Sequence, residues 1–193
     1  IFFKEFKILN YNWNRRICKW PLIYIASKKG IPSLIQEQNS YPGITNKILA
    51  KYVQKICVAF ENTQRFFPPE KIVLTGNPIR EDILNLKNKN EAGKRLFRIN
   101  ESKLTILVIG GSLGARTINN AISDNLQRLN SIGVNLIWQT RIYYESKAKK
   151  LISNINVEEF NVSRFIKEMD KAYAVADIII SRSGAIAISE LCC

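Results

Sequence analysis

The stretch of this sequence best suited to bind a ligand is a glycine-rich turn behind an apolar run. Residues 104–109 read LTILVI, and residues 110–114, which read GGSLG and include Ser112, follow at once. The run predicts a strand buried on both faces, and the pattern after the turn predicts a helix. Glycines let the backbone approach a ligand closely, and the start of a helix presents unpaired N–H groups that favour an anion. The turn is therefore a candidate phosphate or diphosphate site. Its spacing matches neither the dinucleotide nor the Walker fingerprint, and an ordinary strand–helix turn is the alternative interpretation.

Three further polar turns, at residues 36–43, 75–80 and 181–184, also follow predicted strands. Ligands of open α/β sheets bind at the edge formed by the carboxyl ends of the strands. The side chains in or after these turns that could contact a ligand are Asn39, Arg80, Ser189 and Glu190. From spacing alone, Asn39 could equally be a turn residue, Arg80 a surface cation, and Glu190 an acid favoured by the dipole at the start of a helix.

The elements that must position these turns alternate along the chain. Strands are predicted at residues 31–35, 55–60, 71–74, 104–109, 133–139, 161–166 and 177–181. Helices are predicted at residues 22–29, 44–52, 91–97, 116–129, 146–152 and 169–176, and from residue 186 onward. This alternation predicts an α/β fold with doubly wound parallel sheets, in two sets. Because Pro78 excludes helix at Asn77, we expect a linker at residues 75–80 between domains of residues 1–80 and 81–193.

Composition narrows the class of protein. The 193 residues are 46% hydrophobic, which is enough for a core, and 29 basic against 16 acidic residues give a net charge of +13. That charge suits an anionic partner, but the lysines are scattered, and their abundance with isoleucine and asparagine is also typical of an A/T-biased genome.

The absence of histidine excludes a Ser-His-Asp or Cys-His mechanism within this chain. The four cysteines form no CxxC pair, so they are typical of reduced thiols in a cytosolic protein and predict no metal site. No apolar run is long enough for a membrane span, and no signal peptide is visible.

Four strings in order carry a resemblance to a known family. They are IPSLIQEQNSYPGITN, TGNPIR, GGSLGARTIN and SRSGAIAISEL, and the matching text covers residues 21–191. Together they resemble the MurG family, glycosyltransferases that add N-acetylglucosamine from UDP-N-acetylglucosamine to the undecaprenyl-linked muramoyl-pentapeptide, lipid I. The resemblance implies the GT-B fold, two Rossmann-like domains of which this chain holds the back half of the first and the front half of the second.

The resemblance also implies a donor site. Asn39, Arg80 and Ser112 would contact UDP-N-acetylglucosamine, and the backbone of Ile166 would hold the uracil. The remaining donor-site positions would be Ala185, Ile186, Ala187, Ile188, Ser189 and Glu190. Glu190 would accept hydrogen bonds from the ribose hydroxyls, since a carboxylate only accepts, and helix N-termini could stabilise the departing diphosphate without a metal or other cofactor. No residue of this chain can be named as the catalytic base.

Two functional hypotheses follow. The first is a partial transferase at the cytoplasmic side of the bacterial inner membrane, peripheral because its acceptor is lipid-linked, with the basic excess suiting anionic headgroups. The second is an inactive fragment or the product of a decayed gene, with at most residual nucleotide binding. A nucleic-acid partner is not expected, because the basic residues are not clustered with aromatic ones.

The chain departs from the family pattern in three places. The opening strand and glycine loop with its histidine are absent, as is the glutamine-bearing loop that completes the sugar pocket. Residues 8–20 are the third departure, and we hypothesise that they are translated out of frame. Codons exist for residues 10–20 that, read one base later, spell IIIGTGGYASG, which restores the GxGGYxSGP loop that the family carries there.

Overall fold

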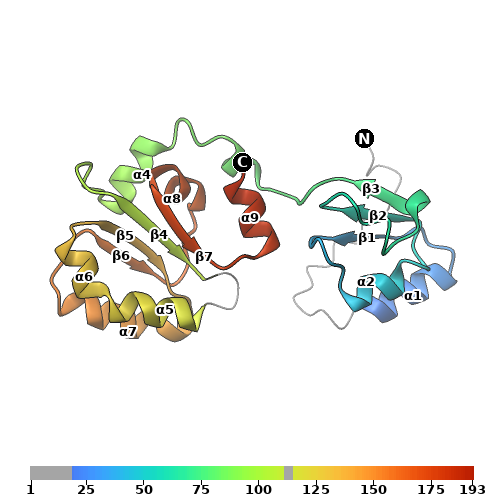
Figure 1. The fold of residues 1–193 in the computed structure, drawn as a ribbon, viewed down its shortest axis with the longest axis horizontal. Helices are drawn as coiled ribbons and strands as arrows, with labels where there is room; N and C mark the ends of the chain where they lie inside the picture. Colours follow the sequence, from blue (N-terminus) through green and yellow to red (C-terminus); the bar gives the residue numbers. More distant parts are fainter. Residues whose placement is uncertain (1–18, 111–114) are drawn as a thin grey trace. The chain divides into compact units, whose positions relative to one another are not determined.

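The computed structural model describes residues 19–110 and 115–193 (Figure 1). The hypothesised frame change therefore lies outside the described residues, except for its last two positions. The chain divides into two compact units between Pro78 and Ile79, in the turn after the third strand. Each unit is built on a parallel sheet.

The described part of the first unit holds a three-stranded sheet with the order β1-β2-β3. Its strands are β1 (Leu34–Glu37), β2 (Lys55–Val58) and β3 (Ile72–Leu74). Its helices are α1 (Lys19–Lys28), α2 (Ile44–Leu49) and the short 3-10 helix η2 (Pro69–Lys71). Helices α1 and α2 lie together on one side of the sheet (Figure 1). The hydrophobic core of this unit is formed by Ile35, Leu49, Ala50, Val53, Ile56, Val58 and Phe67.

The described part of the second unit holds a four-stranded sheet with the order β6-β5-β4-β7. Its strands are β4 (Thr105–Ile109), β5 (Asn135–Gln139), β6 (Phe160–Ser163) and β7 (Ile178–Ser181). Helices α5 (Arg116–Asp124), α6 (Leu126–Ser131) and α7 (Ile142–Ser153) cover one face, and α4 (Asn90–Phe97) and α8 (Met169–Val175) cover the other (Figure 1). The remaining helices are α3 (Glu81–Leu84) and α9 (Ala185–Leu191).

Strands β4 and β5 are buried at every residue. Alternate side chains enter different cores: Leu107 and Ile137 pack with residues of α4 and α8, whereas Val108 and Trp138 pack with residues of α5, α6 and α7. A strand buried on both faces reads as a continuous apolar run, which is the pattern that predicted residues 104–109 as a strand. The prediction of parallel α/β sheets is confirmed.

Several predicted boundaries were wrong. The strand expected at residues 31–35 is Leu34–Glu37, and the helix expected at residues 146–152 is Ile142–Ser153. The helix expected over residues 116–129 is two helices, because Asn125 leaves helical geometry at φ −112° and ψ 10°. Its side-chain Nδ2 donates to the carbonyl of Ala121 at 2.9 Å, and Leu126 then turns into the core. The helix expected over residues 22–29 begins earlier, at Lys19.

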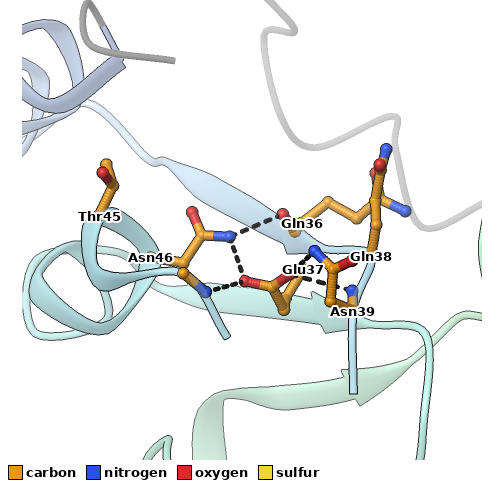
Figure 2. Close-up of a pocket in the computed structure, with 7 residues that line it drawn as sticks. Gln36, Glu37, Gln38, Asn39, Thr45 and Asn46 are labelled. Carbon is orange, nitrogen blue, oxygen red and sulfur yellow. Dashed lines mark hydrogen bonds between the residues drawn. The ribbon is translucent and has the colours of Figure 1, made fainter. Parts of the chain in front are cut away.

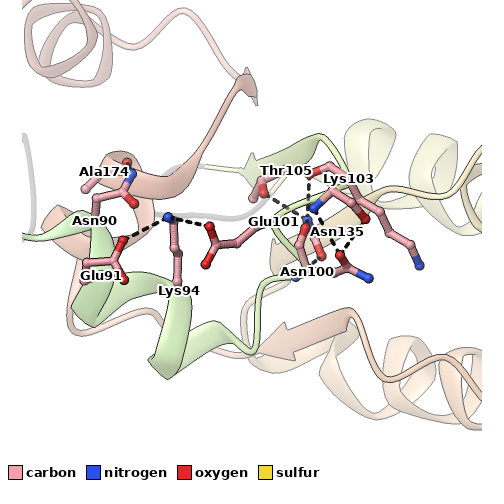
Figure 3. Close-up of polar contacts among 10 residues, drawn as sticks. Asn90, Glu91, Lys94, Asn100, Glu101, Lys103, Thr105, Asn135 and Ala174 are labelled. Carbon is pink, nitrogen blue, oxygen red and sulfur yellow. Dashed lines mark hydrogen bonds and ion pairs between the residues drawn. The ribbon is translucent and has the colours of Figure 1, made fainter.

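A buried amide joins the start of β5 to the segment before β4 (Figure 3). The Asn135 side chain is inaccessible to solvent, its Oδ1 accepts from the N–H of Asn100 at 2.9 Å, and its Nδ2 donates to the carbonyls of Asn100 and Lys103 at 3.0 Å each. Nδ2 also lies 3.2 Å from Thr105 Oγ1. Asn135 therefore satisfies backbone groups that a loop could not otherwise bury without cost.

Asn135→Ala should lower the free energy of unfolding of the second unit by about 2–4 kcal/mol, because it removes a fully buried amide together with its hydrogen bonds to the backbone of Asn100 and Lys103. Denaturant unfolding followed by tryptophan fluorescence measures the change in a background with Trp13→Phe and Trp20→Phe, which leaves Trp138 as the reporter. Asn154→Ala, at an exposed position of the same unit, is the control. Equal, small effects of the two substitutions would contradict the assignment.

Candidate functional site

A cavity of about 320 Å³ lies at the carboxyl end of β1 in the first unit (Figure 2). It is lined by Gln36, Glu37, Gln38, Asn39, Gly43, Thr45 and Asn46. These residues come from β1, the turn after it and the start of α2. The place is the one that ligands of parallel sheets occupy, and the sequence predicted a polar turn there.

Glu37 is the centre of this cavity's polar network (Figure 2). It is only 3% exposed, and its carboxylate accepts hydrogen bonds from both sides. Oε1 accepts from the backbone N–H and from Nδ2 of Asn39, both at 3.0 Å. Oε2 accepts from the N–H of Gly43 at 3.0 Å and from Nδ2 of Asn46 at 2.8 Å. The carboxylate therefore ties the turn after β1 to the first turn of α2.

The pKa of Glu37 reflects two opposing effects. Burial acts to raise it, but the hydrogen bonds from Asn39, Asn46 and Gly43 outweigh burial and hold the pKa of Glu37 below its ordinary value. The group is therefore ionised at neutral pH. Its negative charge lies beside the N-terminus of α2, where the helix dipole favours it.

The network also fixes which end of the Asn39 amide faces Glu37. A carboxylate only accepts, so the end that faces Glu37 must be Nδ2, and Oδ1 is the acceptor end of the amide. Asn39 is exposed and lines the cavity, so it can accept a hydrogen bond from a hydroxyl or an N–H group. Sequence reasoning missed Glu37, although an acidic residue that ends a buried strand is itself a signal of a partnered carboxylate.

The second unit brings Arg80 and Glu190 together. Arg80 Nε lies 3.5 Å from Glu190 Oε1, and the hydroxyl of Tyr173 donates to Glu190 Oε2 at 3.1 Å. The Glu190 side chain is 13% exposed and that of Arg80 is 47% exposed. Burial, together with the neighbouring Glu190 carboxylate, raises the pKa of Tyr173 far above its ordinary value, although Arg80 acts against this. The phenol is thus a neutral donor.

The other expected donor-site residues fall into three groups. Ala185 to Glu190 all lie in α9, which begins after Gly184, and the hydroxyl of Ser189 donates to the carbonyl of Ala185 at 2.9 Å. Ile166 is buried, and its N–H already donates to Oε1 of the buried Gln139 at 2.9 Å. A nucleobase bound by this backbone would donate a hydrogen bond to the Ile166 carbonyl, or its own acceptor would compete with Gln139 for the Ile166 N–H. Ser112 and the rest of its glycine turn lie outside the described residues.

Comparisons with known proteins bear on this arrangement. Residues 105–193 match the model of the glycosyltransferase family 28 C-terminal domain. A relative from Parabacteroides distasonis, named UDP-N-acetylglucosamine–N-acetylmuramyl-(pentapeptide) pyrophosphoryl-undecaprenol N-acetylglucosamine transferase, is 50% identical over 172 residues, or 89% of this chain and 47% of the relative. A relative of the same name from Cytophaga hutchinsonii is 49% identical over 89% of this chain and 46% of its own length. The crystal structure of Acinetobacter baumannii MurG matches with a TM-score of 0.60 and 32% identity, over 89% of this chain and 46% of that one.

The chain is similar to MurG transferases over 89% of its length. It spans about half the length of the curated relatives that it matches. The resemblance seen in the four sequence strings is confirmed, and the fold is of the GT-B class. No described helix of this chain is long and apolar enough to cross a membrane.

Glu37 makes the first unit sensitive to acid. Because its pKa is lower in the folded than in the unfolded state, its contribution to stability is present above the unfolded pKa and is lost as the pH falls through the folded pKa. We expect amide hydrogen exchange in β1 and β2 to accelerate below about pH 4 beyond the intrinsic rate change.

Glu37→Gln should remove this acid sensitivity and destabilise the first unit at pH 7 by about 2–4 kcal/mol, because the new NH₂ group faces N–H donors. Glu61→Gln, at an exposed position of the same unit, should leave both the stability and its pH profile as in the wild type. A wild-type pH profile in Glu37→Gln would refute the assignment.

Proposed function

We propose that this chain is part of a glycosyltransferase that moves N-acetylglucosamine from UDP-N-acetylglucosamine to undecaprenyl-pyrophosphoryl-MurNAc-pentapeptide, lipid I. The product would be lipid II of peptidoglycan synthesis. The observation that carries the proposal is the match to relatives named for this transfer, at 47–50% identity over 88–89% of the chain.

In this proposal residues 81–193, preceded by Arg80, hold the donor nucleotide. Glu190 suits the ribose, because each carboxylate oxygen can accept about two hydrogen bonds, and Tyr173 and Arg80 leave one direction open on each. Arg80 brings a positive charge beside that carboxylate, where it can also approach a diphosphate. Ser112 and the N–H groups after it are proposed to bind the departing diphosphate, and Ile166 to contact the uracil.

Residues 1–80 are proposed to form the acceptor and membrane side. Asn39 supports this unit's share of the donor site, since it lines the cavity and its Nδ2 is held by Glu37. A lipid-linked acceptor places the protein at the cytoplasmic face of the bacterial inner membrane, as a peripheral protein. The net charge of +13 suits the anionic lipid headgroups there.

A second candidate function is nucleotide binding without transfer. The observation that favours it is that Arg80 and Glu190, two of the residues expected to contact the nucleotide, already lie together within the second unit. Both candidates predict that the second unit binds UDP, and they differ in whether sugar reaches a lipid acceptor.

Calorimetric titration of the full chain with UDP tests both candidates. We expect binding, and we expect Glu190→Gln to weaken it about tenfold, because the carboxylate loses charge and acceptor capacity toward the ribose hydroxyls. Glu158→Gln, at an exposed position of the same unit, should bind like the wild type.

Transfer of radiolabelled sugar from UDP-N-acetylglucosamine to a lipid I analogue then separates the candidates. Transfer supports the glycosyltransferase, and UDP binding without transfer supports the second candidate. A chain that binds no UDP would contradict both.

A further inference from the structure

Tyr173 is a buried polar side chain that the expected donor site does not include. Its residue is 8% exposed, and its ring packs in the core between the sheet and helices α4 and α8. Packing alone would be satisfied by phenylalanine. The hydroxyl lies at the edge of this core and donates a hydrogen bond to the Glu190 carboxylate on α9 at 3.1 Å.

The helix that carries Tyr173 is held firmly in place. The side chain of Lys89 pairs with Asp170 at 2.9 Å. Nδ2 of Asn90 donates to the carbonyl of Ala174 at 2.8 Å, and Figure 3 shows these two residues. Gly93 of α4 lies so close to α8 that an added Cβ would come within 2.6 Å of the Lys171 carbonyl oxygen. The Tyr173 hydroxyl is therefore presented from a fixed position.

The Glu190 carboxylate is restrained but not saturated by the described residues. Tyr173 engages Oε2, and Arg80 Nε lies 3.5 Å from Oε1, beyond an ideal hydrogen bond. With 13% of its side chain exposed, Glu190 remains reachable for a ligand. Glu37 differs, because donors from its own unit bind both of its oxygens and only 3% of the residue is exposed.

We propose that Tyr173 is a positioning residue for nucleotide binding, whose hydroxyl holds the Glu190 carboxylate in the orientation that accepts hydrogen bonds from both ribose hydroxyls. This inference rests on the proposed function, because it requires that Glu190 meets the ribose. A tyrosine hydroxyl suits this role, because it remains a neutral donor over the working pH range and so orients the carboxylate without neutralising it.

The experiment compares two ligands on two proteins. UDP and 2′,3′-dideoxy-UDP are titrated into the full wild-type chain and into Tyr173→Phe. We expect Tyr173→Phe to weaken UDP binding about 5- to 10-fold and to change binding of the dideoxy ligand less than about twofold, because a ligand without ribose hydroxyls has nothing to gain from an oriented carboxylate.

Tyr144→Phe is the matched control. Tyr144 lies in α7, on the other face of the same sheet, and its hydroxyl also makes hydrogen bonds, to Asn120 Oδ1 at 2.8 Å and with Ser123 Oγ at 3.0 Å. Its loss should leave the affinities for both ligands unchanged. A double variant, Tyr173→Phe with Glu190→Gln, should bind UDP no more weakly than Glu190→Gln alone, and so tests the coupling independently.

Each result decides the matter. Equal weakening of both ligands by Tyr173→Phe, or additive losses in the double variant, would show a purely structural role and overturn the inference while leaving the proposed function in place. Equal wild-type affinity for UDP and its dideoxy analogue would also overturn it, since Glu190 would then not meet the ribose. Absence of UDP binding to the wild type would overturn the proposed function and this inference with it.

Discussion

The constraint on which the second unit depends is that a parallel sheet must be covered on both faces. Strands β4 and β5 have every residue buried, so successive side chains enter opposite cores and helices must lie on each side. Parallel pairing also places the carboxyl ends of neighbouring strands at one edge, as the pairing of Ile109 with Gln139 and with Ser181 shows. Turns far apart in the sequence are thereby collected at that edge.

Two carboxylates illustrate how environment separates structural from ligand-binding roles. Glu37 is enclosed and bound by donors on both oxygens, so its charge is used to hold the turn of Asn39 against the start of α2. Glu190 is oriented by Tyr173 and neighboured by Arg80, yet it remains reachable from solvent. A saturated carboxylate organises a site, whereas a restrained one with open lone pairs can take part in binding.

Sequence reasoning succeeded where structure is local and failed where it depends on partners. It found the apolar strands and the polar turns after them, but it joined α5 and α6, because the periodic pattern hides the bond from Asn125 to the Ala121 carbonyl. It also could not foresee that Gln139, 27 residues away, accepts from the N–H of Ile166.

By itself the sequence determined the alternation of strands and helices, the order of the four motifs and the family, because these depend on residue types within short windows. The tertiary structure alone decided which polar groups meet. Tyr173 and Glu190 are 17 residues apart, and Asn135 and Asn100 are 35 apart. Such pairs form because the folded sheet brings segments that are far apart in the sequence into contact. A local sequence pattern does not specify which distant residue will be the partner. The orientation of Asn39 likewise follows from a buried carboxylate whose donors come from two elements.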